Sequence, residues 1–104
     1  MQTMPPVEVE LASKVQCREW VSQKCQILDV RGEAEFASDH YPGALNIPLD
    51  RLADWASQQN CDAPLVLYCG KGIRAQMGIN QLKGLGFTQL ANGGSLAQLK
   101  ETLG

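Results

Sequence analysis

The chain has 104 residues and a formal net charge of −2, with nine Lys and Arg against eleven Asp and Glu. This length suits one domain over residues 1–104 with a core of its own. The lack of a basic excess argues against a nucleic-acid-binding protein, and the lack of a run of about 18 apolar residues argues against a membrane span.

The chain contains one histidine and four cysteines, none of which form a C-x-x-C pair. The cysteines are Cys17, Cys25, Cys61 and Cys69. This spacing indicates neither a metal site nor a redox dithiol, and residues 1–13 lack the basic and apolar regions of a signal peptide. We therefore expect a cytoplasmic protein with free thiols. The alternatives are a mature periplasmic protein and a chain with two disulfide bridges.

The first third of the chain predicts two strands and two helices. Alternating residues at 7–10 predict a short edge strand. Apolar residues at nearly helical spacing over 11–23, with Ser13 as the N-cap, predict a helix. Residues 26–31 form an apolar run that ends in charge, which is typical of a buried strand with a solvent-exposed tip. Residues 32–38 are expected to form a brief helix.

The rest of the chain continues the alternation of strands and helices. Strands are predicted at 44–47, 63–68 and 87–90, and the middle one lacks alternation, as expected for a parallel strand buried on both faces. Helices are predicted over residues 49–58, over residues 73–85, and after a glycine turn with Ser95 as N-cap. This order predicts an α/β fold with a mainly parallel sheet, whose ligands bind at the carboxyl ends of the strands.

Cys69 lies between the 63–68 strand and the helix that begins near residue 73. The loop after it consists of Gly70, Lys71, Gly72, Ile73 and Arg74. The glycines allow several backbone N–H groups to converge on one point, while the helix N-terminus and the two cations add positive charge. We therefore expect Cys69 to be ionised and nucleophilic near neutral pH. The alternative is a small buried residue that ends a core strand.

Four segments in this order resemble the rhodanese domain. They are DVR at 29–31, GALNIP at 43–48, the cysteine loop at 69–74 and GG at 93–94. The resemblance spans residues 8–100 and implies a three-layer fold with about five strands in a mainly parallel sheet flanked by helices. It also implies that Cys69 accepts a sulfane sulfur as a persulfide, and that the five loop amides surround the outer sulfur.

Cysteine phosphatases resemble this layout but place five residues between the cysteine and the arginine. Here four residues separate Cys69 from Arg74, and the tighter ring suits one sulfur atom better than a tetrahedral phosphate. No Asp general acid is evident near the loop. A phosphatase or an arsenate reductase is therefore the less favoured interpretation.

The charged residues near the loop have two interpretations each. In thiosulfate-using rhodaneses a cation at the position of Lys71 is linked to binding of the anionic donor; the alternative is a solvated lysine. Arg74 either binds the donor or ties the loop to a carboxylate. Asp29 and Arg31 are expected to support the site as a structural ion pair, and Glu33 is a candidate partner for either arginine.

The sequence thus predicts a thiosulfate sulfurtransferase that needs no cofactor or metal and acts on neither nucleic acid nor membrane. Its expected partners are a small anionic sulfur donor, a thiophilic acceptor such as cyanide or a thiol, and a sulfur-relay protein. The alternative is a persulfide carrier or docking module for a dedicated partner protein, with low turnover of small molecules. Ala75 departs from the Ser that many family members have after the loop arginine, which bears on the subfamily.

Overall fold

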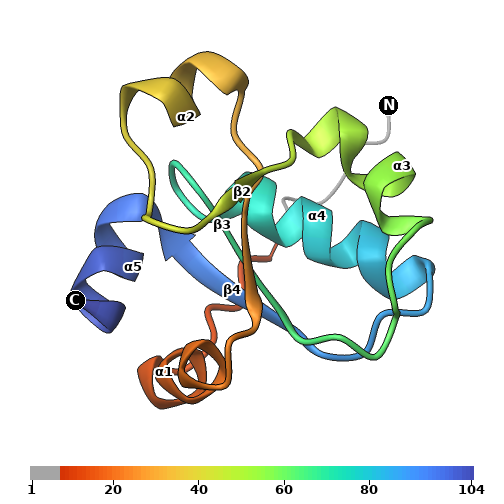
Figure 1. Ribbon diagram of the computed structural model, residues 1–104, viewed down its shortest axis with the longest axis horizontal. Helices are drawn as coiled ribbons and strands as arrows, with labels where there is room; N and C mark the ends of the chain where they lie inside the picture. Colours follow the sequence, from red (N-terminus) through yellow and green to blue (C-terminus); the bar gives the residue numbers. More distant parts are fainter. Residues whose placement is uncertain (1–7) are drawn as a thin grey trace, which may run out of the picture.

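A computed structural model of the chain describes residues 8–104, in which helices cover both faces of a parallel sheet (Figure 1). The strands are β1 (Gln26–Asp29), β2 (Leu45–Asn46), β3 (Leu65–Cys69) and β4 (Leu90–Ser95). Their order in the sheet is β2-β1-β3-β4, and every pair is parallel. The predicted α/β class is therefore confirmed.

Four of the five α-helices in the described residues pack in pairs on the two faces of the sheet. The helices are α1 (Lys14–Ser22), α2 (Glu33–Ser38), α3 (Leu52–Ala56) with the preceding 3₁₀ turn η1 (Leu49–Arg51), α4 (Ile73–Gly84) and α5 (Leu96–Leu103). Figure 1 shows α3 and α4 on one side of the sheet and α1 and α5 on the other. The helix α2 follows β1 and stands at the carboxyl end of that strand.

Serine side chains start two of these helices, as the sequence predicts. The Ser13 hydroxyl accepts a hydrogen bond from the Gln16 N–H at the start of α1. Ser95 and Gln98 form a reciprocal capping box at the start of α5. Each cap provides partners for backbone N–H groups that the first helical turn leaves without an acceptor.

The N-terminal edge of the sheet differs from the prediction of a strand at residues 7–10. Residue 7 lies outside the described part of the chain, and residues 8–10 are not in a strand. Instead, Leu11 forms a single parallel bridge with Asn92, and the Ala12 N–H donates to the Asn92 carbonyl at 3.0 Å. The described residues thus form four strands, with this bridge at the outer edge of β4 where a fifth strand would pair.

The last strand begins where the sequence predicted it to end. Residues 87–90 were expected to form it, whereas β4 runs over Leu90–Ser95 and includes the glycine pair that suggested a turn. Phe87 is buried in the core instead, and its N–H donates to the carbonyl of Leu82 in α4. Gly93 suits this position because it has no side chain: an added Cβ would lie only 2.9 Å from Leu99 Cδ1.

Strand β3 is buried along its whole length and divides the core in two. Leu65, Leu67 and Cys69 pack in the cluster that contains α3 and α4, because alternate side chains point to opposite faces of a strand. Val66 and Tyr68 pack in the cluster that contains Leu99 of α5. The fold therefore brings Cys69 to the carboxyl end of a central strand, on the side of α4.

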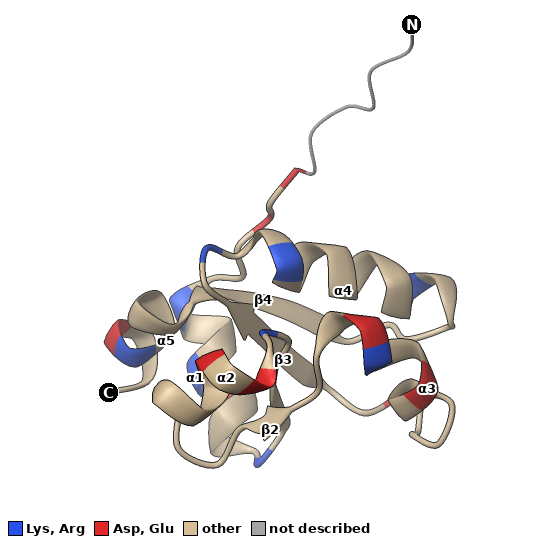
Figure 2. Cartoon of the chain, turned by 90° about the horizontal axis from the view of Figure 1, so that it is seen from above, with Lys and Arg blue, Asp and Glu red and all other residues tan. Residues whose placement is uncertain are grey.

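Charged residues of both signs are interspersed over the helices and loops of the described chain (Figure 2). Among residues 8–104, no helix has the length and apolar character needed to cross a membrane.

The contact of α4 with α3 and β3 gives a test of the packing. An added Cβ at Gly78 would lie 2.9 Å from Leu52 Cδ2 and 3.0 Å from Leu67 Cδ2. We expect Gly78→Ala to lower the free energy of unfolding by about 1–2 kcal/mol, because overpacking costs more than alanine gains in helix propensity. Gly84→Ala is the matched control, since an added Cβ there meets no atom within 4 Å. Urea unfolding curves in which both variants match the wild type in stability would contradict this packing.

Candidate active site

Cys69 is the last residue of β3 and is only 1% exposed. Its Sγ accepts hydrogen bonds from the N–H of Gly72 at 3.0 Å and from the N–H of Ala75 at 3.4 Å. The residue is thus buried, as the alternative interpretation required. Its sulfur nevertheless accepts hydrogen bonds from two backbone N–H groups, and such bonds stabilise negative charge on a sulfur atom. The sequence did not predict the donor from Ala75.

The turn at Gly72 brings these donors to the sulfur. Gly72 has φ +87°, a left-handed conformation that favours glycine, and it is the N-cap of α4. The following N–H groups of Ile73 and Arg74 lie in the first turn of the helix, which provides no intrahelical acceptor for them. An added Cβ at Gly72 would lie 3.4 Å from the Cα of Gly94. Close approach of the two backbones therefore links the late glycine pair to the cysteine loop.

A pocket of about 470 Å³ lies at Cys69 and the loop that follows it. Its lining residues are Glu35, Cys69, Gly70, Lys71, Ile73 and Arg74. Four of the five predicted loop residues line this pocket together with the cysteine, while Gly72 is buried and does not line it. Lys71 is exposed and makes no ion pair with a residue in the described part of the chain. The pocket is thus lined both by the cysteine and by a lysine that has no ion pair with a described residue.

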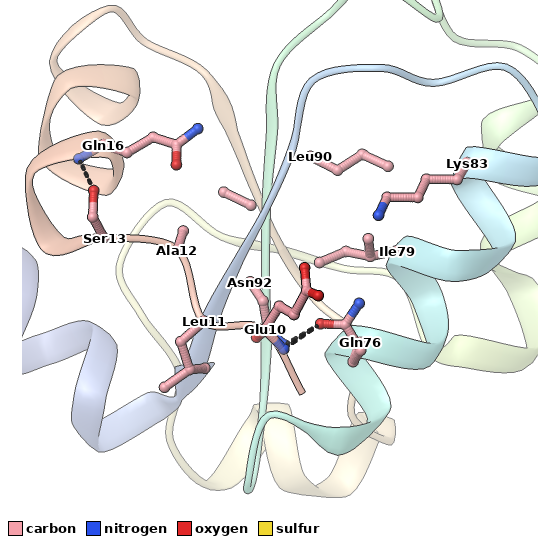
Figure 3. A pocket seen from close by; sticks show the side chains of 11 residues that line it. Glu10, Leu11, Ala12, Ser13, Gln16, Gln76, Ile79, Lys83, Leu90 and Asn92 are labelled. Carbon is pink, nitrogen blue, oxygen red and sulfur yellow. Dashed lines mark hydrogen bonds between the residues drawn. The ribbon is translucent and has the colours of Figure 1, made fainter. Parts of the chain in front are cut away.

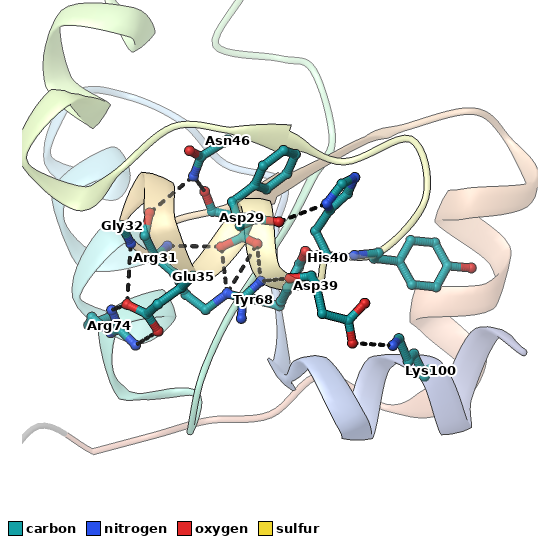
Figure 4. A network of polar contacts seen from close by, with 12 residues as sticks. Asp29, Arg31, Gly32, Glu35, Asp39, His40, Asn46, Tyr68, Arg74 and Lys100 are labelled. Atoms are coloured by element: carbon teal, nitrogen blue, oxygen red, sulfur yellow. Dashed lines mark hydrogen bonds and ion pairs between the residues drawn. The ribbon is translucent and has the colours of Figure 1, made fainter.

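Arg74 is tied to a carboxylate of α2 (Figure 4). Its Nη1 and Nη2 donate to the two Glu35 carboxylate oxygens at 2.8 and 3.0 Å. This pairing lowers the pKa of Glu35 from its ordinary value of 4.5 to about 2 and raises the pKa of Arg74. Glu33, which the sequence suggested as an arginine partner within the site, instead pairs with Arg51 of η1 at 3.0 Å.

Asp29 and Arg31 form a buried ion pair beside the site but do not line the pocket (Figure 4). The guanidinium of Arg31 donates to both carboxylate oxygens of Asp29, with a shortest distance of 2.7 Å, and to the backbone carbonyl of Asp39. It also lies over the ring of Tyr68, 5.6 Å from the centroid. The pair therefore joins β1, β3 and the end of α2, which is the structural arrangement that the sequence led us to expect.

The other three cysteines lie outside the pocket. All four cysteines are free thiols. Burial raises the pKa of the Cys17 thiol, and burial together with nearby Cys17 raises the pKa of Cys25 to about 11. The described residues contain no group of three or more His, Cys, Asp or Glu that could hold a metal ion. Among the four cysteines, Cys69 is thus the one that lines this pocket and whose sulfur accepts hydrogen bonds at a helix N-terminus.

Two residues that contact the loop were not predicted from the sequence, namely Glu35 and Asn92. Glu35 stands three residues after Gly32, the spacing of a capping box, and its Oε1 accepts from the Gly32 N–H at 3.4 Å. That pattern could have placed Glu35 in the first turn of α2 but not against Arg74. Asn92 donates to the Gly72 carbonyl at 3.0 Å, and no local pattern signals this contact because the two residues are brought together only by the sheet.

The rhodanese-like domain model matches residues 10–97, so the chain belongs to the rhodanese-like domain family. The uncharacterized protein YqhL of Bacillus subtilis is 36% identical over 70 residues, which cover 67% of this chain and 56% of YqhL. The thiosulfate sulfurtransferase GlpE of Shewanella oneidensis is 35% identical over 66 residues, which cover 64% of this chain and 65% of GlpE. The chain therefore matches less than two thirds of the length of either relative.

A solved structure shows the same fold. The rhodanese-like domain of the Alr3790 protein from Anabaena superposes with a TM-score of 0.73 at 24% identity, covering 94% of this chain and 75% of that chain. The four parallel strands and the flanking helices are therefore those of a rhodanese fold, as the resemblance in the sequence implied.

The Arg74–Glu35 pair gives a pH-dependent test of stability. A carboxyl group whose folded pKa lies near 2 contributes stability that is present above about pH 4.5 and is lost as the pH falls toward 2. The two side chains are 40% and 46% exposed, so solvent limits the effect. We expect Glu35→Gln to lower the free energy of unfolding by up to about 1 kcal/mol at neutral pH. The difference from the wild type should shrink below pH 4.5 in urea titrations.

Glu33→Gln is the control for this test. The Arg51–Glu33 pair is more exposed, at 66% and 67%, so we expect its loss to leave stability nearly unchanged. Equal effects of the two substitutions at every pH would show that the Arg74–Glu35 pair does not hold the loop.

Proposed function

We propose that this protein is a sulfurtransferase in which Cys69 carries a sulfane sulfur as a persulfide. The observation that supports this most directly is Cys69, which lines a pocket of about 470 Å³ while its Sγ accepts the Gly72 N–H at 3.0 Å. A thiolate held by backbone amides at a helix N-terminus is a prepared nucleophile.

The proposed reaction proceeds in two displacements. The Cys69 thiolate attacks the outer sulfur of thiosulfate, the S–S bond of the donor breaks, and sulfite leaves with the electron pair. Cys69 then carries a persulfide with one negative charge. A nucleophilic acceptor such as cyanide or a thiolate takes the outer sulfur and returns the electron pair to Cys69, which regenerates the thiolate. This is covalent catalysis with ping-pong kinetics.

The loop supplies the stabilisation that the persulfide needs. We propose that the backbone amides of the loop surround the outer sulfur; they belong to Gly70, Lys71, Gly72, Ile73 and Arg74. Such amides are fixed before the reaction begins, so little reorganisation accompanies the development of charge. Cys69 is the catalytic residue of this scheme, and the Asp29–Arg31 ion pair supports the strand that presents it through the contact of Arg31 with the Tyr68 ring.

Thiosulfate is the proposed donor because of the charges around the pocket. Arg74 is already neutralised by Glu35 at 2.8 Å, whereas Lys71 has no ion-pair partner in the described residues. Lys71 can therefore attract a small dianion to the pocket, while Arg74 braces the loop. The similarity to a thiosulfate sulfurtransferase also supports this choice. A phosphatase is disfavoured, because an arginine held by a carboxylate is less able to clamp phosphate.

The alternative function is a persulfide carrier for a dedicated partner protein. Ile73 at the pocket edge is 46% exposed, and Met77, one turn further along α4, is 39% exposed. Exposed apolar side chains beside a reactive sulfur favour contact with a protein surface. Comparing turnover of thiosulfate and cyanide with transfer from a protein persulfide distinguishes the two functions, since a carrier would be slow only with the small molecules.

The role of Cys69 can be tested by intact mass. Treatment with thiosulfate is expected to add about 32 Da, one sulfur atom, to the wild type and nothing to Cys69→Ser, because only the Cys69 thiolate attacks the donor. Cys61→Ser is the matched control, a half-buried thiol outside the pocket, and it should gain the same mass as the wild type. A mass gain in Cys69→Ser would show that a residue other than Cys69 carries the sulfur.

The role of Lys71 can be tested by steady-state kinetics. We expect Lys71→Ala to raise the KM for thiosulfate about fivefold, the effect of losing one exposed charge contact. The rate of sulfur release from the persulfide should change less, because the acceptor step does not need the cation. Lys14→Ala removes the same charge from α1 as a control. An unchanged KM for thiosulfate would show that Lys71 does not contribute to binding of the donor.

A further inference from the structure

A buried amide contacts the cysteine loop and does not line the pocket. The Nδ2 of Asn92 donates to the Gly72 carbonyl at 3.0 Å and to Gln76 Oε1 at 3.2 Å. Its Oδ1 accepts from the Gly94 N–H at 2.9 Å. Asn92 is only 2% exposed, so these contacts are shielded from water and the side chain has little freedom to leave them.

The orientation of the Asn92 amide follows from its partners. The Gly94 backbone nitrogen can only donate, so it must face the Asn92 oxygen. The NH₂ group then faces two oxygens, the Gly72 carbonyl and Gln76 Oε1, which can only accept. Asn92 therefore donates to the loop, and no flipped arrangement satisfies the same partners.

Gln76 connects this amide to the N-terminal segment (Figure 3). Its Oε1 also accepts from the Glu10 N–H at 3.0 Å, and its Nε2 donates to Asn80 Oδ1 at 3.2 Å. Gln76 is 4% exposed, whereas Asn80 is exposed. The network thus runs from the surface through Gln76 and Asn92 to the carbonyl of Gly72.

The carbonyl that Asn92 holds belongs to the peptide between Gly72 and Ile73. The C=O and N–H of a trans peptide point in opposite directions. Holding the Gly72 carbonyl against Asn92 therefore directs the Ile73 N–H to the other side of the loop, where Ile73 lines the pocket with Cys69. Gly72, at φ +87°, lacks the side chain that would otherwise hinder rotation of this peptide.

Building on the proposed function, we propose that Asn92 is a positioning residue that keeps the Ile73 N–H directed at the outer sulfur of the Cys69 persulfide. With the peptide reversed, the Gly72 carbonyl oxygen would face the anionic sulfur and repel it. Asn92 then acts on the stability of the persulfide rather than on binding of the donor.

The size of the effect is limited by a second contact of the same carbonyl. The Gln76 backbone N–H also donates to the Gly72 carbonyl at 3.0 Å, as the first hydrogen bond of α4. This bond remains when Asn92 is replaced. Complete loss of a donor to a reacting anion costs about 100- to 1,000-fold, so a partly restrained peptide is expected to cost about tenfold.

The test measures the equilibrium of the first displacement. Wild-type and variant proteins are equilibrated with thiosulfate and sulfite at fixed ratios, and the persulfide fraction is read by intact mass. Asn92→Asp keeps the acceptor for the Gly94 N–H but, once ionised, cannot donate to the Gly72 carbonyl. We expect its equilibrium constant for persulfide formation to fall about tenfold, while the KM for thiosulfate stays within about twofold. Asn92→Ala, which introduces no charge, should shift the equilibrium in the same direction.

Asn80→Ala is the matched control, because it removes the outer end of the network and leaves the Asn92–Gly72 contact in place. Its persulfide equilibrium should match the wild type. Wild-type equilibrium constants in folded Asn92→Asp and Asn92→Ala would overturn the positioning role, as would an equal shift in Asn80→Ala. Failure of the wild type itself to gain about 32 Da would instead overturn the proposed persulfide chemistry and this inference with it.

Discussion

The hydrogen bond from the Gly72 N–H to the Cys69 sulfur, at 3.0 Å, is the contact on which the rest of the site depends. It requires β3 to end at the cysteine, α4 to begin four residues later, and the backbone between them to turn through a left-handed glycine. The buried strand and the packed helix fix both ends of this loop. The fold thus holds a sulfur atom at the positive end of a helix.

The two cations of the loop differ in whether they have an ion-pair partner. Arg74 is held by both oxygens of Glu35, so its main contribution is to join α4 to α2. Lys71 projects from the same loop without an ion pair in the described chain. One cation therefore stabilises the loop and the other remains available to an anion, a division that the residue types alone do not reveal.

The loop is supported from behind by polar side chains rather than by apolar packing alone. Asn92 and Gln76 are almost fully buried, and their amide groups have hydrogen-bond partners in the N-terminal segment, in α4 and in the loop. Buried amides are stable only when they are paired in this way. Because each pairing has a fixed direction, the network specifies how the loop backbone faces the pocket.

Local patterns in the sequence were sufficient for most elements and for the centre of the site. The caps at Ser13 and Ser95, the apolar run before Cys69 and the glycine loop each depend on residues a few positions apart, so the sequence by itself determined them. Placing Cys69 at the carboxyl end of a central strand followed from the same patterns.

Only the tertiary structure decided which distant groups meet. The start of β4 depends on its pairing with β3, in which Leu90 lies opposite Leu65, and glycines that locally favour a turn were drawn into the strand. Glu35 reaches Arg74 across 39 positions, and Asn92 reaches Gly72 across 20. Such contacts depend on how strands and helices pack together, and short-range preferences carry no information about that packing.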